Sequence, residues 1–80
     1  MAKLQKWSVD IEGETHTVEF KKRTLFSKAR ITIDGMTFPL FSVKLFSAHQ
    51  EVFKLGDTRA ILEISKNGKA SIIIDGEKMQ

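Results

Sequence analysis

Residues 7–20 read WSVDIEGETHTVEF, and this stretch decides the fold because apolar and polar side chains alternate on both sides of a glycine. The positions that share the apolar face are Trp7, Val9, Ile11, His16, Val18 and Phe20. Alternation with a period of two is typical of strands that bury one face and expose the other. The stretch therefore predicts two antiparallel strands joined by a turn at Gly13.

The same alternation continues through most of the chain. Further strands are expected at 29–33, 36–40, 53–55, 60–64 and 70–74, with a short last strand near Met79. Asp-Gly at 34–35 and 75–76 and Asn-Gly at 67–68 favour type I′ hairpin turns, which need positive φ at both central residues. We therefore expect one all-β domain over residues 1–80, an antiparallel β-sandwich or flattened barrel of about eight short strands.

The apolar positions change parity at Pro39. They are Met36, Phe38 and Leu40 before the change and Phe41, Val43 and Leu45 after it. A slip of one residue beside a proline is typical of a bulge or bend. It predicts that a long strand passes here from one sheet to the other.

Composition limits the classes of function. The chain has 13 basic and 10 acidic residues and no cysteine, so disulfides, thiolate nucleophiles and cysteine-based zinc sites are excluded. A small domain without disulfides suits a reducing compartment, and we expect a cytoplasmic protein. The opening MAKLQKWSVD becomes charged too early for a signal peptide. No apolar run approaches the roughly 20 residues that span a bilayer.

The sequence lacks the motifs of the common enzyme and nucleotide sites. It has no G-x-S-x-G, no P-loop and no dinucleotide fingerprint. His16 lies close in sequence to Glu12, Glu14 and Glu19, but a zinc site needs three or four converging ligands. Because His16 shares the apolar face of its strand, we expect it to cap the sheet with one hydrogen bond. We expect no catalytic residue, no metal and no cofactor.

The segment KKRTLFSKAR, residues 21–30, is the most informative candidate for a binding site. Its cations Lys21, Lys22, Arg23, Lys28 and Arg30 surround Leu25 and Phe26. Such a loop can anchor a partner protein through its apolar residues, or bind an anionic polymer such as nucleic acid or a membrane surface. It can also be a solvated turn whose Phe26 folds back over the open end of the sandwich. A partner protein is the leading hypothesis.

Two other features bear on binding. Ile61 and Ile73 lie opposite the apolar faces of their strands, which indicates either strands covered on both sides or an exposed patch for a partner or a second copy. The parity of Trp7 favours the core. The alternative is a site for a small ligand or carbohydrate around Trp7 and His16.

The order Trp7-x-Val9-x-Ile11, then Gly13-x-x-His16-x-Val18-Glu19-Phe20, resembles the start of a Fas apoptotic inhibitory molecule domain. The similarity continues through RITIDG, VKLFSAHQEVFKLG, AILEI and SIIIDGEKM, which occupy 30–35, 43–56, 60–64 and 71–79. The resemblance implies a compact, non-enzymatic β-sandwich.

Animal members of that family carry two such domains in tandem and act in cell-survival signalling and in protection against protein aggregation. The length of this chain suits one copy. Its loop KKRTLFSKAR departs from the small Gly/Thr/Ser-rich loop that the family tends to have. Binding through that loop is therefore not carried over from the family.

Overall fold

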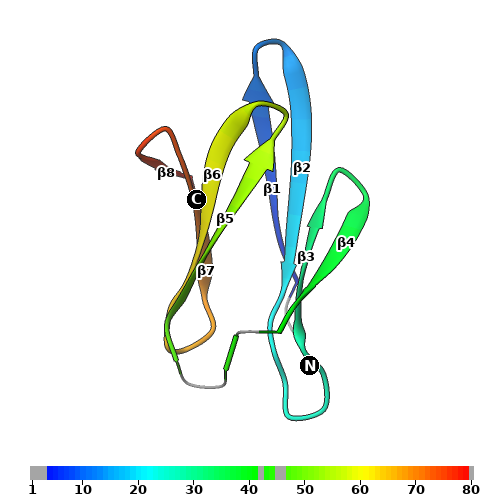
Figure 1. The fold of residues 1–80 in the computed structure, drawn as a ribbon, viewed down its shortest axis with the longest axis vertical. Helices are drawn as coiled ribbons and strands as arrows, with labels where there is room; N and C mark the ends of the chain where they lie inside the picture. The colour runs from blue at the N-terminus through cyan, green and yellow to red at the C-terminus, as the bar shows by residue number, and fades with distance from the viewer. Residues whose placement is uncertain (1–3, 42, 45–46, 80) are drawn as a thin grey trace.

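The computed structural model describes residues 4–41, 43–44 and 47–79. These residues contain strands and no helix. The strands are β1 (Leu4–Ile11), β2 (Glu14–Lys21), β3 (Ala29–Ile33), β4 (Met36–Leu40), β5 (His49–Leu55), β6 (Thr58–Ile64), β7 (Ala70–Ile74) and β8 (Glu77–Met79). They form two four-stranded antiparallel sheets, β1-β2-β3-β4 and β5-β6-β7-β8 (Figure 1). The all-β sandwich is confirmed. The flattened barrel is wrong, because no described strand pairs with a strand of the other sheet.

The Asp-Gly turns have the predicted geometry. Asp34 and Gly35 have φ of 47° and 86°, and Asp75 and Gly76 have φ of 51° and 83°. Both central residues are thus left-handed, as a type I′ turn requires. Aspartate and glycine occur together here because both tolerate this conformation.

The predicted type I′ turn at Asn67-Gly68 is wrong. In that turn only Gly68 has positive φ, and its amide donates to the Ser65 carbonyl at 2.9 Å. The Asn67 side chain instead accepts a hydrogen bond from the Lys69 amide at 3.1 Å. Five residues, 65–69, connect β6 and β7, so this hairpin has a longer loop with a single glycine in the left-handed region.

The core lies between the inner faces of the two sheets, on the positions that the alternation predicts. Its fully buried large side chains are Val18, Phe20, Leu55, Leu62 and Ile72. Each side chain of this size stabilises the fold by about 1.5–3 kcal/mol when it leaves water. Trp7 is also buried, so its place in the core is confirmed and its ring is not a surface platform for a sugar.

The structure corrects the expected long strand through Pro39. β4 ends at Leu40, which is buried, whereas Phe41 is 66% exposed. Val43 is buried but belongs to the crossover that leads to β5, and Leu45 lies outside the described residues. The chain does leave the first sheet where the parity changes. The described residues of the connection to β5, which are 41, 43–44 and 47–48, are not in a strand.

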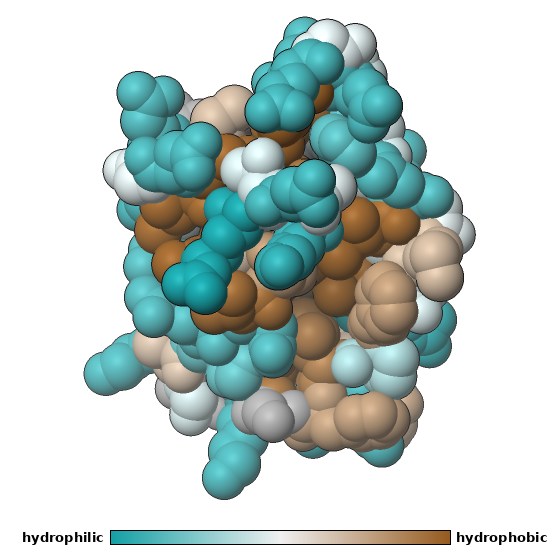
Figure 2. Space-filling view, turned by 45° about the horizontal axis from the view of Figure 1, so that its top comes forward, coloured by the Kyte–Doolittle hydropathy of each residue, from teal (hydrophilic) through white to brown (hydrophobic). Residues whose placement is uncertain are grey.

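The sandwich is open along the β4 and β5 edges. Met36 and Phe38 point to the inner face of the first sheet, as partners of Ile33 and Ile31, yet Met36 is 64% exposed. A groove of about 670 Å³ runs between β4 and β5. Figure 2 shows apolar side chains gathered over this region. The alternation thus identifies the correct face of β4, but the second sheet does not cover it.

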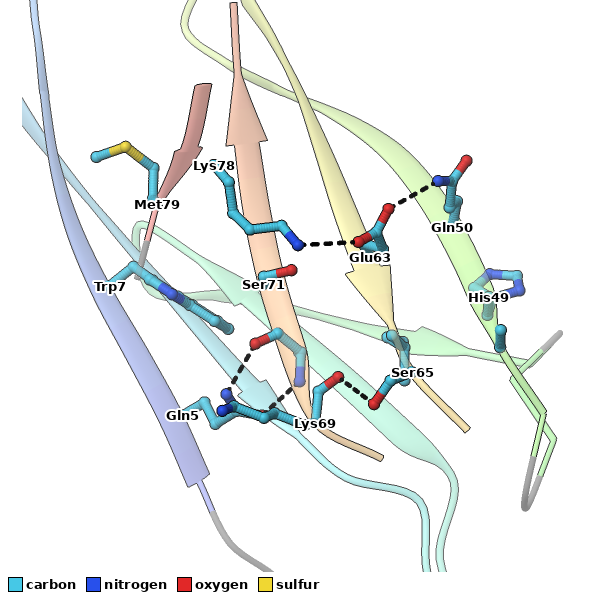
Figure 3. Close-up of a pocket in the computed structure, with 13 residues that line it drawn as sticks. Gln5, Trp7, His49, Gln50, Glu63, Ser65, Lys69, Ser71, Lys78 and Met79 are labelled. Atoms are coloured by element: carbon cyan, nitrogen blue, oxygen red, sulfur yellow. Dashed lines mark hydrogen bonds and ion pairs between the residues drawn. The ribbon is translucent and has the colours of Figure 1, made fainter. Parts of the chain in front are cut away.

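On the opposite side, the Gln5 side chain links the two sheets. Its Nε2 donates to the Ala70 carbonyl at 3.0 Å, and its Oε1 accepts from the Ala70 amide at 2.9 Å (Figure 3). β8 pairs with β7 only from Ile72 to Ile74. The amide of Gln5 therefore replaces the missing strand at Ala70 and holds β1 beside β7.

We expect Gln5→Leu to lower the free energy of unfolding by about 1–3 kcal/mol, since it leaves a buried amide and carbonyl of Ala70 unpaired. Urea denaturation measures this change. Gln50→Leu is the matched control, because the one side-chain partner of Gln50 among the described residues is Glu63, at the surface. We expect this change to cost less than about 0.5 kcal/mol. Equal losses in both variants would contradict the role of Gln5.

Candidate functional site

The β2–β3 loop presents two apolar side chains at its tip. The Thr24 amide donates to the Ser27 carbonyl at 2.9 Å. The Thr24 hydroxyl accepts from the amides of Phe26 and Ser27 at 3.2 and 3.0 Å. Leu25 and Phe26 are 79% and 97% exposed. The interpretation that Phe26 folds back over the sandwich is therefore wrong, and the hydrogen-bonded turn holds both side chains in solvent. We call Leu25 and Phe26 the loop tip.

The structure does not bring the five cations of residues 21–30 together. Lys21 and Arg30 are cross-strand partners on the outer face of the first sheet, at the base of the loop. Lys28 places its Nζ 4.2 Å from the centroid of the Phe41 ring, a cation–π contact. Lys22 and Arg23 border a pocket that the other three cations do not line. The loop therefore lacks the continuous basic strip that tracking a polymer backbone requires.

The pocket beside Lys22 and Arg23 lies at one end of the sandwich, and we call it the end pocket. There the β2–β3 loop, the crossover and the β6–β7 turn come together, at the lower end of the molecule in Figure 1. The volume of the pocket is about 480 Å³. Its main lining residues are the cations Lys22, Arg23, Lys44 and Lys66 and the apolar Phe20, Val43 and Ile64. Sequence reasoning missed Lys44 and Lys66, since nothing in their spacing links them to the loop.

Ile61 and Ile73 lie side by side on the outer face of the second sheet. They are cross-strand partners, and Val52 pairs with Ile61 in the same row. Both isoleucines are half-buried, whereas Val52 is exposed. No other described strand covers this row completely, and its role as a contact surface stays a prediction.

His16 makes the expected hydrogen bond, but with a partner distant in sequence. Its Nδ1 lies 2.7 Å from Oδ2 of Asp34, in the β3–β4 turn. Oδ1 of Asp34 accepts from the Thr17 amide at 2.9 Å. These hydrogen bonds, first that of His16 and then that of Thr17, hold the pKa of Asp34 below its ordinary value. Glu14 lies 3.8 Å from the other ring nitrogen, so the two carboxylates do not converge on one point.

The remaining polar side chains near the pockets form hydrogen bonds and ion pairs with one another. A pocket of about 990 Å³ runs from Trp7 across to Glu63, whose carboxylate bonds to Gln50 and Lys78 at 3.0 and 3.5 Å (Figure 3). His49 bonds to Glu51 at 3.0 Å. In the part of the chain that the structure describes, no three His, Asp or Glu side chains are grouped to hold a metal ion. No helix there is long and apolar enough to cross a membrane.

The fold and these surfaces define a small antiparallel β-sandwich domain with an exposed apolar loop tip and a cationic pocket beside it. The chain belongs to the family Fas apoptotic inhibitory molecule (FAIM1), whose family model matches residues 3–79. The resemblance of the Trp7 to Phe20 stretch is thereby confirmed. Comparison with curated proteins and with solved structures gave no match.

The His16–Asp34 contact predicts a pH dependence. Because folding lowers the pKa of Asp34, its ionised form stabilises the fold above the ordinary value of 3.8, and this contribution is lost as the pH falls through the lower folded pKa. We expect Asp34→Asn to lower the melting temperature at about pH 5–7, which lies above the ordinary pKa of 3.8. The difference from the parent protein should shrink below pH 3.8.

Asp75→Asn is the matched control for this measurement. Asp75 has the same place in a type I′ turn, with φ of 51°, and none of the hydrogen bonds of the described residues joins it to a histidine. Asparagine tolerates the left-handed conformation at both sites. Thermal melts followed by circular dichroism at several pH values should show a pH-dependent deficit only for Asp34→Asn. The same profile in both variants would contradict the role of His16.

Proposed function

We propose that this domain is a non-catalytic protein-interaction module that contacts its partner through the loop tip, Leu25 and Phe26. The observation that carries the proposal is the 97% exposure of Phe26 on a turn that four hydrogen bonds of Thr24 and Ser27 hold in place. A preorganised aromatic anchor loses little conformational freedom on binding, and such residues dominate the binding energy of protein interfaces.

The surroundings of the tip support a protein partner rather than a polymer. The cations that flank the tip point in different directions, so they suit the polar rim of an interface better than a track of phosphates. Ile61 and Ile73 form a second apolar surface that suits a further contact or a second copy of the chain. This proposal includes a cytoplasmic location, which suits a chain without cysteine.

The polar groups support a non-catalytic role. His16 and His49, the two histidines, bond to carboxylates. No hydrogen bond among the described residues joins either histidine to a serine or threonine hydroxyl, as an activated nucleophile would need. Family membership supports a FAIM-like role, although an inhibitory role in apoptosis is named for the family and not for this chain.

The test is capture of partners by the immobilised domain from a nuclease-treated lysate of its own organism, measured by quantitative mass spectrometry. We expect Leu25→Ala/Phe26→Ala to reduce the recovery of the main partner by at least about tenfold, as loss of a central apolar anchor does. Leu4→Ala/Phe41→Ala removes the same side-chain types from other exposed positions. That control should recover the partner as the parent domain does.

Two outcomes would contradict the proposal. One is equal recovery by the parent domain and the loop-tip variant. The other is loss of binding only when Lys21, Lys22 and Arg23 are changed to Glu, with a steep dependence on salt and on intact nucleic acid. That second result would assign the loop to an anionic polymer.

A further inference from the structure

The end pocket is a concentrated positive site. Lys22, Arg23, Lys44 and Lys66 line it, and none of the described residues in its lining is an aspartate or glutamate. The chain as a whole has 13 basic and 10 acidic residues, so the excess of cations at the end pocket is much larger than in the whole chain. The ion pairs of the described residues involve none of these four cations. Their charges are therefore available to a ligand.

Arg23 is held in place with part of its guanidinium unused. Its Nη1 donates to the Val43 carbonyl at 3.1 Å, which ties the loop to the crossover. Its Nε is buried and has no hydrogen-bond partner among the described residues. A buried N–H without an acceptor is uncommon in native proteins and requires an explanation. Guanidinium groups bind oxyanions through N–H donors, and Arg23 is held at the wall of the end pocket.

The approach of Lys22 depends on a glycine in the opposite sheet. A Cβ built on Gly68 would lie 2.3 Å from Cε and 3.0 Å from Nζ of Lys22. Lys22 lies across the β6–β7 turn where Gly68 has no side chain, and a larger residue at 68 would require the flexible end of Lys22 to move. This contact places its ammonium group beside the turn that also carries Lys66. Lys22 follows β2 of the first sheet and Lys66 lies in the turn between β6 and β7 of the second, and both line the end pocket.

The size and floor of the pocket indicate the ligand. A volume of about 480 Å³ is typical of small-molecule sites, and the other three cations of residues 21–30 point away from it. Phe20, Val43 and Ile64 form an apolar floor under the charges. We infer that the end pocket binds the phosphate group of a small phosphate monoester whose organic part packs on this floor.

The test is a titration of the isotope-labelled domain followed by two-dimensional NMR. Its probes are inorganic phosphate, phenyl phosphate, and benzoate as the carboxylate counterpart, all at constant ionic strength. We expect saturable shifts of the Gly68 and Thr24 amide signals, with phenyl phosphate bound more tightly than inorganic phosphate. Benzoate should bind at least about tenfold more weakly than phenyl phosphate, because it carries less charge and fewer acceptor oxygens.

Two variants with the same loss of charge separate the pocket from general electrostatics. Lys44→Gln/Lys66→Gln removes two pocket cations and should weaken phenyl phosphate at least about tenfold. Lys28→Gln/Lys54→Gln removes two cations outside the pocket and should change affinity less than about twofold, since exposed charges at a distance are screened. All four lysines are exposed, so both variants should keep the fold.

Equal weakening in the two variants would overturn the inference, because it would show attraction to net charge alone. Benzoate bound as tightly as phenyl phosphate would overturn the assignment to phosphate. Shifts confined to the Lys21 and Arg30 face would overturn the site. The titration contains no partner protein and leaves Leu25 and Phe26 intact, so its failure does not bear on the proposed function.

Discussion

The packing of one apolar face against another holds this molecule together, since strand pairing alone would leave two separate sheets. Within each sheet the strands pair in sequence order, β1 to β4 in one sheet and β5 to β8 in the other, and β4 does not pair with β5. The two halves are joined by side chains such as Phe20 from the first sheet and Leu62 and Ile72 from the second, all without solvent exposure. Burial of apolar area thus supplies the main driving force between the sheets.

The two sheets have four edge strands, β1, β4, β5 and β8, and each has a different feature that limits pairing with another strand. At β1 the Gln5 side chain crosses to β7 and completes its hydrogen bonding. β4 carries Pro39, which has no amide to offer to another strand. On β5 the charged Glu51 occupies an inner-face position opposite Leu62, a feature that discourages pairing with another chain. β8 has only three residues.

The two sides of the sandwich are closed to different extents. The β1 side is tied by hydrogen bonds, whereas the β4 and β5 side is an open apolar groove. The connections, in contrast, gather at the ends of the molecule. The end pocket is built by three of them, so its charges come from parts of the chain that share no local pattern. The loop tip beside the pocket is held by its own turn and does not depend on the groove.

The sequence by itself determined most of the strands, the two Asp-Gly turns, the apolar face of each strand and the family, whereas of β5 (His49–Leu55) it gave only the end at 53–55. The physical reason is that alternation and turn chemistry are local properties, and each strand has one face to bury. The failure at Asn67-Gly68 has a local cause as well, because the loop is longer than the dipeptide indicates.

Only the tertiary structure decided which faces are covered and which charges meet. Alternation placed Met36 on the inner face but could not show that the second sheet stops short of it. The partner of His16 is Asp34, 18 residues away, because the β3–β4 turn folds against β2. Lys44 lies in the crossover and Lys66 in the β6–β7 turn, and both line the end pocket. Such meetings depend on how the two sheets stack, which no local pattern encodes.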